Sequence, residues 1–477
     1  MKEQNSQSKC KTRAQRRSNI SLSLTSLFVV LLGSTVVLAG CGGGGGNGNG
    51  GPGIGGLTPP TLAPAIAGLN SIVRGSQAVT VSNLTTIAGQ FDQARQADPT
   101  NKDAQLGFAV STAAIASAQA AALGGGASIP AIRAASANNS GSTLAPAMRT
   151  AQLSQALVLW RLPQFLSGGS AASWPRAADF LPTGTLQAHL QPRSVSVTPI
   201  QVQTELTALD ASLVKVEAAL KVVESDPNYS YTLADPAKPK DTSASVKIGV
   251  AEIQILSAVI SAVRSLANAG LAYNADPGTF DFSTPVPSSV FGGTAVSPAQ
   301  YLPAAPFLTL AADGGSRMGN VKSELAATAL SGIAAIESVK TRSNAGFLLD
   351  PGTIVTSNEL NQIEAQITSY QTFLTSVQTI PVGTHAGTVE MKVNLAAFLD
   401  HPPTDLRVLL PTLAVSNDNS GTTNLTMNGF PDSTFGGIFP DGLPANPTSF
   451  KLRAISGGVP AGLKYRDVVS FALTLPS

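Results

Sequence analysis

Apolar residues recur at helical spacing in at least five long segments of this 477-residue chain, and several of these segments end at a proline. In residues 83–97 the apolar side chains fall on one stripe, and Asp98-Pro99 follows directly. A longer stripe begins at Pro199 and ends before Asp226-Pro227. Similar stripes occupy residues 318–339 and 356–377, and residues 102–123 are expected to form an alanine-rich helix that ends at Gly124-Gly125-Gly126. Because proline interrupts a helix, these segments predict separate helices packed on one another, and thus a mainly α fold.

Residues 243–273 form an unusually apolar segment, which we also expect to be one helix. Its apolar side chains leave little polar face, and a helix of that kind is usually central in a core. Lys247, Glu252 and Arg264 argue against a membrane span. We therefore place this helix in the middle of the body.

The pattern changes after Pro381, where apolar and polar residues alternate from Val389 to Leu395. This is the period of a half-buried strand. A short helix is expected over Asp405–Leu410, between two prolines, and strand is expected to lie largely beyond residue 385. The predicted architecture is an irregular helical bundle or a helical-hairpin stack with a small mixed α/β C-terminal cap.

The N-terminal 40 residues have the organisation of a secretion signal. Residues 1–17 carry six basic residues and one acidic residue, and residues 20–39 carry no charge. The stretch ends at Leu38-Ala39-Gly40-Cys41, which resembles the bacterial lipobox residue for residue. The resemblance implies cleavage before Cys41 and lipidation of Cys41 with diacylglycerol and a fatty acyl chain such as palmitate. A transmembrane anchor and a twin-arginine signal at Arg16-Arg17 are the alternatives.

A glycine-rich stretch follows Cys41 and is typical of a flexible tether. The expected organisation is a signal peptide over residues 1–40, a tether over 41–60, a helical domain over 61–380 and a small mixed C-terminal subdomain over 381–477.

Charge and cysteine content exclude several classes of function. The chain has a formal charge of +2, and residues 1–40 contribute six bases and one acid, so the mature part lies near −3. It has no cluster of basic residues, and we expect no nucleic-acid partner. Cys10 leaves with the signal and Cys41 carries lipid, so thiolate catalysis, cysteine-ligated zinc and iron–sulfur clusters are excluded.

Histidines provide no catalytic or metal-binding constellation. His189, His385 and His401 are far apart in sequence, and none belongs to a helical pair spaced to hold zinc. We expect no catalytic residue, no metal ligand and no cofactor.

Four short motifs fall short of known sites. Gly314–Met318 lacks the last glycine of a hydrolase elbow and is more typical of a helix start. Gly457–Gly462 has Leu463 where a phosphate loop needs lysine, and lysine comes one residue later. Ser212 and Lys215 match a penicillin-binding pattern without its companion motifs. Asn417–Thr422 offers oxygen ligands for calcium, but an Asx turn is simpler without a bidentate glutamate.

The chain resembles known proteins in two further ways. Phe91, Ala94, Pro99 and Asn101 resemble the second half of a tetratricopeptide repeat, although the next unit does not continue the pattern. The lipobox, the tether and the stretch from Pro403–Arg407 to Phe430–Ile438 are similar to uncharacterised bacterial predicted lipoproteins described as repeat-containing. This family resemblance supplies no activity.

Three functions remain compatible with the sequence. The first is a non-catalytic module that binds envelope proteins or peptides and is held to a membrane through Cys41. The second is a binder of apolar small molecules or lipids that uses residues 243–273 as a cavity wall. The third is an envelope hydrolase with a site that sequence spacing does not reveal. In a cell with two membranes, Gly42 in place of an aspartate favours the outer one. The sequence leaves the oligomeric state open.

Overall fold

The computed structural model describes most of the chain beyond residue 61, with one long gap between residues 125 and 199. The described residues are 62–74, 76–77, 80–125, 199–234, 243–291, 294–342, 346–347, 357–384, 387–417, 423–442, 451–455, 464–465 and 468. They form nine α-helices and eight strands, most of them short. The prediction of a mainly α fold is confirmed.

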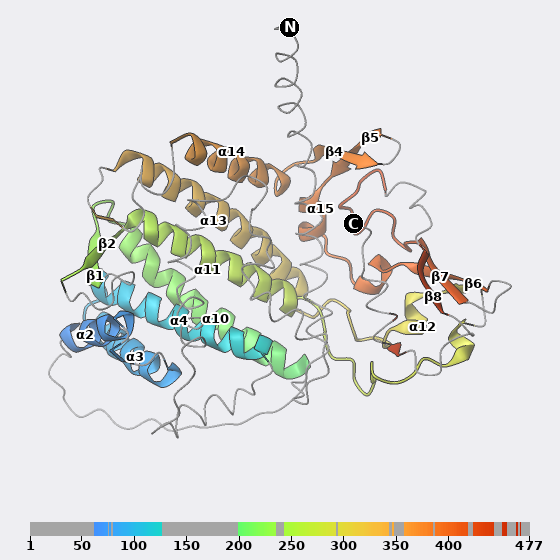
Figure 1. The fold of residues 1–477 in the computed structure, drawn as a ribbon, viewed down its shortest axis with the longest axis horizontal. Helices are drawn as coiled ribbons and strands as arrows, with labels where there is room; N and C mark the ends of the chain where they lie inside the picture. Colours follow the sequence, from blue (N-terminus) through green and yellow to red (C-terminus); the bar gives the residue numbers. More distant parts are fainter. Residues whose placement is uncertain are drawn as a thin grey trace, which may run out of the picture.

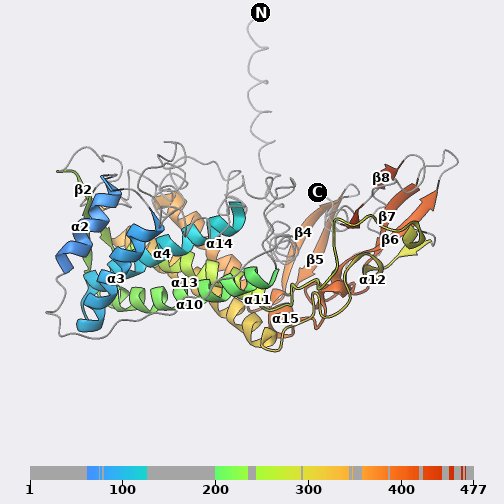
Figure 2. The same ribbon diagram turned by 90° about the horizontal axis from the view of Figure 1, so that it is seen from below.

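Seven helices form a layer in which each helix packs against the next one in this series (Figure 1). Figure 2 shows these helices at one end of an elongated molecule and the C-terminal strands at the other. In chain order the helices are α2 (Leu62–Val73), α3 (Val81–Ala97), α4 (Lys102–Gly125), α10 (Pro199–Glu224), α11 (Val250–Leu271), α13 (Gly314–Thr341) and α14 (Ser357–Phe373).

Local sequence signals set several helix ends. The Thr80 side chain accepts a hydrogen bond from the Asn83 backbone N–H at 3.1 Å and caps the start of α3. Helix α3 ends at Ala97, with Asp98 as its C-cap before Pro99, and α10 begins at Pro199, as predicted. Two apolar residues at the ends of the expected stripes are not buried as predicted. Ile200 is 55% exposed, and Val377 is 48% exposed. Ile200 is the second residue of α10, and Val377 lies beyond the end of α14 at Phe373.

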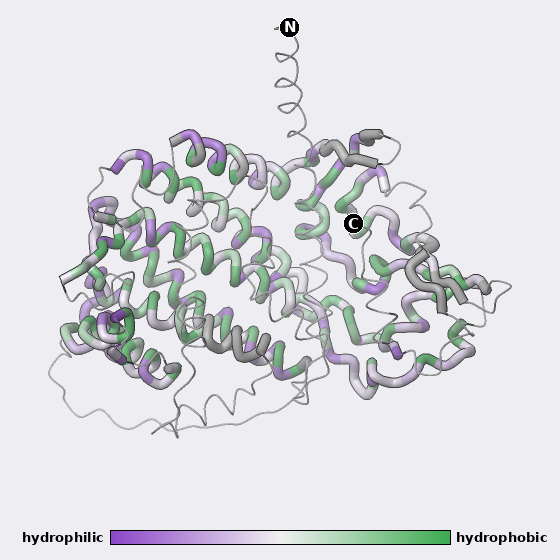
Figure 3. The backbone as a smooth tube through the Cα atoms, viewed as in Figure 1, coloured by the Kyte–Doolittle hydropathy of each residue, from purple (hydrophilic) through white to green (hydrophobic). Residues whose placement is uncertain are grey.

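Helix α11 lies in the middle of the layer, between α10 and α13, as expected from its composition (Figure 3). Ile253, Leu256 and Ile260 join the apolar cluster of α2, α3, α4 and α10, and Ala251 joins a smaller cluster with α13 and α14. Among the described helices, α11 alone is long and apolar enough to cross a membrane, but half of its most apolar window is buried inside the protein.

The prediction of one helix over residues 243–273 is wrong at its N-terminal end. Strand β2 (Ser245–Gly249) precedes α11 and pairs antiparallel with β1 (Ser230–Ala234). Ile248 lies opposite Tyr231, and Val246 lies opposite Leu233. Apolar residues alternate with Lys247 here, and the partner strand, which is separated from β2 by only the ten residues 235–244, completes their hydrogen bonding. Strand therefore occurs well before residue 385, also as β3 (Ala295–Val296) and β4 (Gln378–Thr384).

The C-terminal part combines short helices with strands. β4 pairs with β5 (Gly387–Val393), and a second sheet has the order β3-β6-β7-β8, with β6 at Thr412–Asn417, β7 at Thr423–Gly429 and β8 at Lys451–Ile455. The helical turns are η3 (Ser288–Phe291), α12 (Pro298–Tyr301), α15 (Leu395–Asp400) and η4 (Leu406–Leu409). The short helix expected at Asp405–Leu410 is thus a 3-10 helix. Leu395, expected in a strand, begins α15 because the Asn394 side chain accepts from the Ala397 N–H at 3.2 Å.

A second large apolar cluster contains residues from 269–308 together with residues beyond 390. Met318 and Val321 in the first turns of α13 belong to it, whereas Ile336 and Val339 near the other end of α13 pack with α11 and α14. Helix α13 therefore belongs to both the helical layer and the C-terminal part.

Candidate functional site

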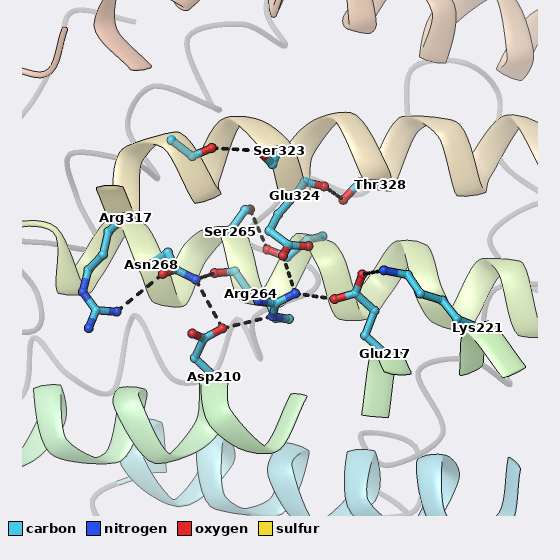
Figure 4. Close-up of polar contacts among 12 residues, drawn as sticks. Asp210, Glu217, Lys221, Arg264, Ser265, Asn268, Arg317, Ser323, Glu324 and Thr328 are labelled. Atoms are coloured by element: carbon cyan, nitrogen blue, oxygen red, sulfur yellow. Dashed lines mark hydrogen bonds and ion pairs between the residues drawn. The ribbon is translucent and has the colours of Figure 1, made fainter. Parts of the chain in front are cut away.

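The most conspicuous polar group in the described structure is a buried cluster around one arginine, which we call the Arg264 cluster (Figure 4). Arg264 projects from α11, Asp210 and Glu217 from α10, and Glu324 from α13. Arg264 Nε lies 3.0 Å from Asp210 Oδ1, and Arg264 Nη1 contacts carboxylate oxygens of both Glu217 and Glu324. The four side chains are between 10% and 18% exposed, so the cluster ties three helices together away from bulk water.

Further polar side chains surround the Arg264 cluster. Asn268 donates to Asp210 Oδ1 at 3.2 Å, and its own Oδ1 lies 3.5 Å from Arg317 Nη1. Lys221 pairs with Glu217 at 2.8 Å from the solvent side, where the lysine side chain is 69% exposed. Both Asp210 and Glu217 thus have two partners.

The electrostatics of the cluster are unbalanced, because three carboxylates surround one guanidinium. Burial raises the pKa of Glu324; Arg264 opposes this shift, and the charge of Glu217 adds to it. Burial tends to lower the pKa of Arg264, but the charges of Glu324, Asp210 and Glu217 outweigh burial and raise it. The three carboxylates therefore favour the charged form of Arg264.

A third acid of α10 continues this polar contact along the helix. Glu224 accepts a hydrogen bond from the Ser257 hydroxyl of α11, and burial raises the pKa of Glu224. Asp210, Glu217 and Glu224 are spaced seven residues apart, which is two helical turns, so all three face α11. We did not predict this series, although its seven-residue spacing on an amphipathic helix is visible in the sequence.

A separate buried ion pair fixes the start of α11. Arg342 donates from Nη1 and Nη2 to the two carboxylate oxygens of Glu252, at 2.9 and 2.7 Å. Glu252 Oε2 also accepts from the Gly249 N–H at 2.9 Å, and the Phe347 ring lies 4.4 Å from the Arg342 guanidinium. This ion pair joins the end of α13 to the start of α11, directly after β2, and therefore stabilises the fold.

The described residues bring no catalytic set together. No group of three or more His, Cys, Asp or Glu side chains in this part of the chain could hold a metal ion. The Ser212 hydroxyl donates to the Ala208 carbonyl at 2.9 Å, one turn back in α10, as expected for a chance motif match. The Arg264 cluster contains acids but no nucleophile, and its guanidinium is occupied by its own carboxylates.

The other residues singled out by the sequence fall as follows. Cys41, His189, His385 and Gly457–Gly462 lie outside the described residues. His401 caps the end of α15 with its backbone N–H and is exposed. Gly314 begins α13, as the helix-start interpretation predicts. Asn417 ends β6, and the rest of that candidate loop is outside the described part.

Residues 404–408 pack against both residues 308–310 and Asp432. The Leu310 N–H donates to the Thr404 carbonyl at 2.9 Å, and the Leu406 N–H donates to the Leu308 carbonyl at 3.0 Å. The Asp432 N–H donates to the Val408 carbonyl at 3.1 Å. These backbone bonds join residues 308–310, 404–408 and 432 into one structural junction.

Two details explain the residue types in this junction. The Asp432 carboxylate accepts from the Thr434 and Gly436 N–H groups at 2.9 and 2.6 Å, and these bonds lower the pKa of Asp432 against the effect of burial. Gly436 has a φ of +66°, and a Cβ there would lie 2.7 Å from Pro403 and 2.8 Å from Phe398. Asp432 and Gly436 therefore stabilise the local fold of this junction.

Comparisons with known proteins found no matching family model, no matching curated protein and no matching solved structure.

Proposed function

We propose that this protein is a lipoprotein of the bacterial cell envelope, cleaved before Cys41 and held to a membrane by acyl chains on that residue. The support is the charged, apolar and small-residue order of residues 1–40 and the cysteine that follows. Two or three acyl chains on one residue give stable attachment where one chain would be marginal. In a cell with two membranes, Gly42 favours the outer one.

We further propose that the folded body is a non-catalytic module that binds proteins or peptides of the envelope. The observation that carries this proposal is the Arg264 cluster. The most concentrated group of charged side chains in the described part is occupied in joining α10, α11 and α13. The apolar side chains left in solvent include Val214 on α10 (44% exposed) and Leu330 on α13 (59% exposed). Such side chains are available to a partner.

We also propose a finer architecture for the folded body. We regard the seven layered helices as a helical-hairpin stack, because each helix packs mainly on its neighbours in this series. We regard the short helices and strands beyond residue 381 as a small mixed cap on that stack. The apolar cluster that α13 shares with them supports this view.

The anchor is tested by replacing Cys41 with serine in the full chain. We expect Cys41→Ser to block processing and lipidation, because the lipid is attached to the thiol. Cys10→Ser is the matched control: that cysteine leaves with the signal and its replacement should change nothing. If Cys41→Ser were still cut before residue 41 and remained in the membrane fraction, the anchor would lie elsewhere.

The interaction module is tested on its exposed apolar side chains. Whole cells are chemically crosslinked, and the full protein is compared with Val214→Asp and Leu330→Asp, with the exposed Glu390→Gln as control. We expect a discrete crosslinked complex that one or both aspartate variants remove while their circular dichroism is unchanged. A complex unaffected by either variant would contradict the use of these side chains. Turnover of an envelope ester or amide by the purified protein would contradict the non-catalytic assignment.

A further inference from the structure

Glu324 lies at the point of α13 where the two large parts of the molecule meet. Val321, three residues earlier on α13, packs in the apolar cluster of the C-terminal part. Ala335 and Ile336, further along α13, are buried in the helical layer. Glu324 itself is 8% exposed and faces α10 and α11 through the Arg264 cluster. Its charge therefore acts on the contact that links the two parts.

The two oxygens of Glu324 have different surroundings. Oε1 contacts Arg264 Nη1, and that same nitrogen also contacts Glu217. Oε2 is buried without a hydrogen-bond partner among the described residues. A carboxylate with one buried oxygen unbonded, which shares its only cation with two other acids, is poorly stabilised as an anion.

The charged groups on each neighbouring element do not change this balance. Helix α10 presents Asp210 and Glu217, and Lys221 reaches Glu217 from solvent. Helix α11 presents Arg264, and Arg317 on α13 is held by Asp313 and Asn268. The acids of the other packed helices have their own cations on α13: Asp400 of α15 pairs with Lys322, and Glu364 of α14 pairs with Lys340. No second cation among these groups reaches Glu324.

We propose that Glu324 binds a proton when the protein folds, and that loss of this proton loosens α13 from α10 and α11. The junction is then a pH-sensitive device, tighter in acidic than in alkaline surroundings. The direction agrees with burial, which raises the pKa of Glu324 above its ordinary value of 4.5, and with Glu217, which adds to the shift; Arg264 and the Ser261 hydroxyl oppose it.

The sign of the effect follows from proton linkage. Between the ordinary glutamate pKa and the raised one, the folded protein binds more protons than the unfolded chain. The stabilising effect is complete below the ordinary pKa and is lost as pH rises through the raised pKa. One proton changes the unfolding equilibrium constant by at most about tenfold per pH unit.

The test compares the unfolding of the full protein with that of Glu324→Gln from about pH 5 to pH 8. Glutamine mimics the neutral acid, so we expect the variant to lose one proton's share of the pH dependence and to be the more stable protein at the alkaline end. Glu390→Gln, which changes an exposed acid of β5, should keep the wild-type slope. A Glu324→Gln slope identical to that of the wild type would overturn the proposal.

A second comparison assigns the proton to one residue. If Glu217→Gln, and not Glu324→Gln, removes the slope, the proton belongs to Glu217 and the assignment is overturned. Hydrogen exchange of the α13 backbone tests the loosening directly. Exchange around residues 318–328 should quicken as pH rises, beyond the intrinsic pH effect, in the wild type and Glu390→Gln but not in Glu324→Gln. Equal behaviour of all three proteins would contradict the device.

Discussion

At the scale of single residues, Arg264 is the centre of the largest buried group of charged side chains in the described part of the chain. One guanidinium joins carboxylates from two other helices, and all four side chains are largely removed from water. A buried ion cluster stabilises a fold less than its charges suggest, because each ion loses its hydration. Removing Arg264 is different, since Asp210 then keeps only the neutral Asn268 and Glu217 keeps only the exposed Lys221.

Arg264→Met should therefore destabilise the protein strongly. It leaves the Asp210 and Glu217 carboxylates and the Glu324 side chain buried without the guanidinium that joins them, and we expect the free energy of unfolding to fall by about 3–5 kcal/mol. The control is Lys392→Met, which breaks an exposed pair with Asp441 and should cost at most about 1 kcal/mol. Urea unfolding monitored by circular dichroism measures both. Similar losses in the two variants would show that the cluster is solvated.

At the scale of elements, the close contact of α3 and α4 depends on a glycine. A Cβ at Gly107 would lie 2.2 Å from Cε1 of Phe91, and the Phe91 side chain is fully buried. The Phe91 and Ala94 pattern that resembles a tetratricopeptide repeat thus marks a real helix-to-helix contact. It does not by itself establish a repeat.

We expect Gly107→Ala to cost about 1–3 kcal/mol, because the fully buried Phe91 ring would have to shift to admit the new methyl group. Gly89→Ala in α3 is the matched control: a Cβ there meets nothing within 4 Å, so it should gain up to about 1 kcal/mol from helix propensity. Thermal unfolding of both variants decides the point. A neutral Gly107→Ala would contradict the close approach of these two helices.

The predicted and observed helices and strands agree where local sequence signals set their ends. The helix over residues 83–97 was expected within two residues of the observed α3, because Thr80 and Asp98 set its ends locally. Strand β2 was missed because its partner β1 lies in a different segment, and five residues of alternation are ambiguous without it. The Arg264 cluster was missed for a related reason. Arg264 is 54 and 47 residues away from Asp210 and Glu217 along the chain, and only the packing of three helices brings them together.

At the scale of the whole molecule, α13 joins the helical layer to the C-terminal part. Met318→Ala, at a position 1% exposed, should cost about 2–5 kcal/mol and weaken both parts together. Leu330→Ala on the same helix, at a position 59% exposed, should change the free energy of unfolding by no more than about 0.5 kcal/mol. Hydrogen exchange under mild denaturant follows the two parts separately. Opening of the C-terminal part alone in Met318→Ala would show that α13 does not couple them.

We propose that Cys41 becomes the lipidated N-terminus of the mature protein and holds it to a membrane. Mass spectrometry of the N-terminal peptide of the mature wild-type protein measures this most directly. We predict a peptide that begins at Cys41 and carries diacylglycerol on sulfur, with or without a third acyl chain on the amine. A mature peptide with an unmodified Cys41 thiol, or one that still contains residues 1–40, would contradict the claim.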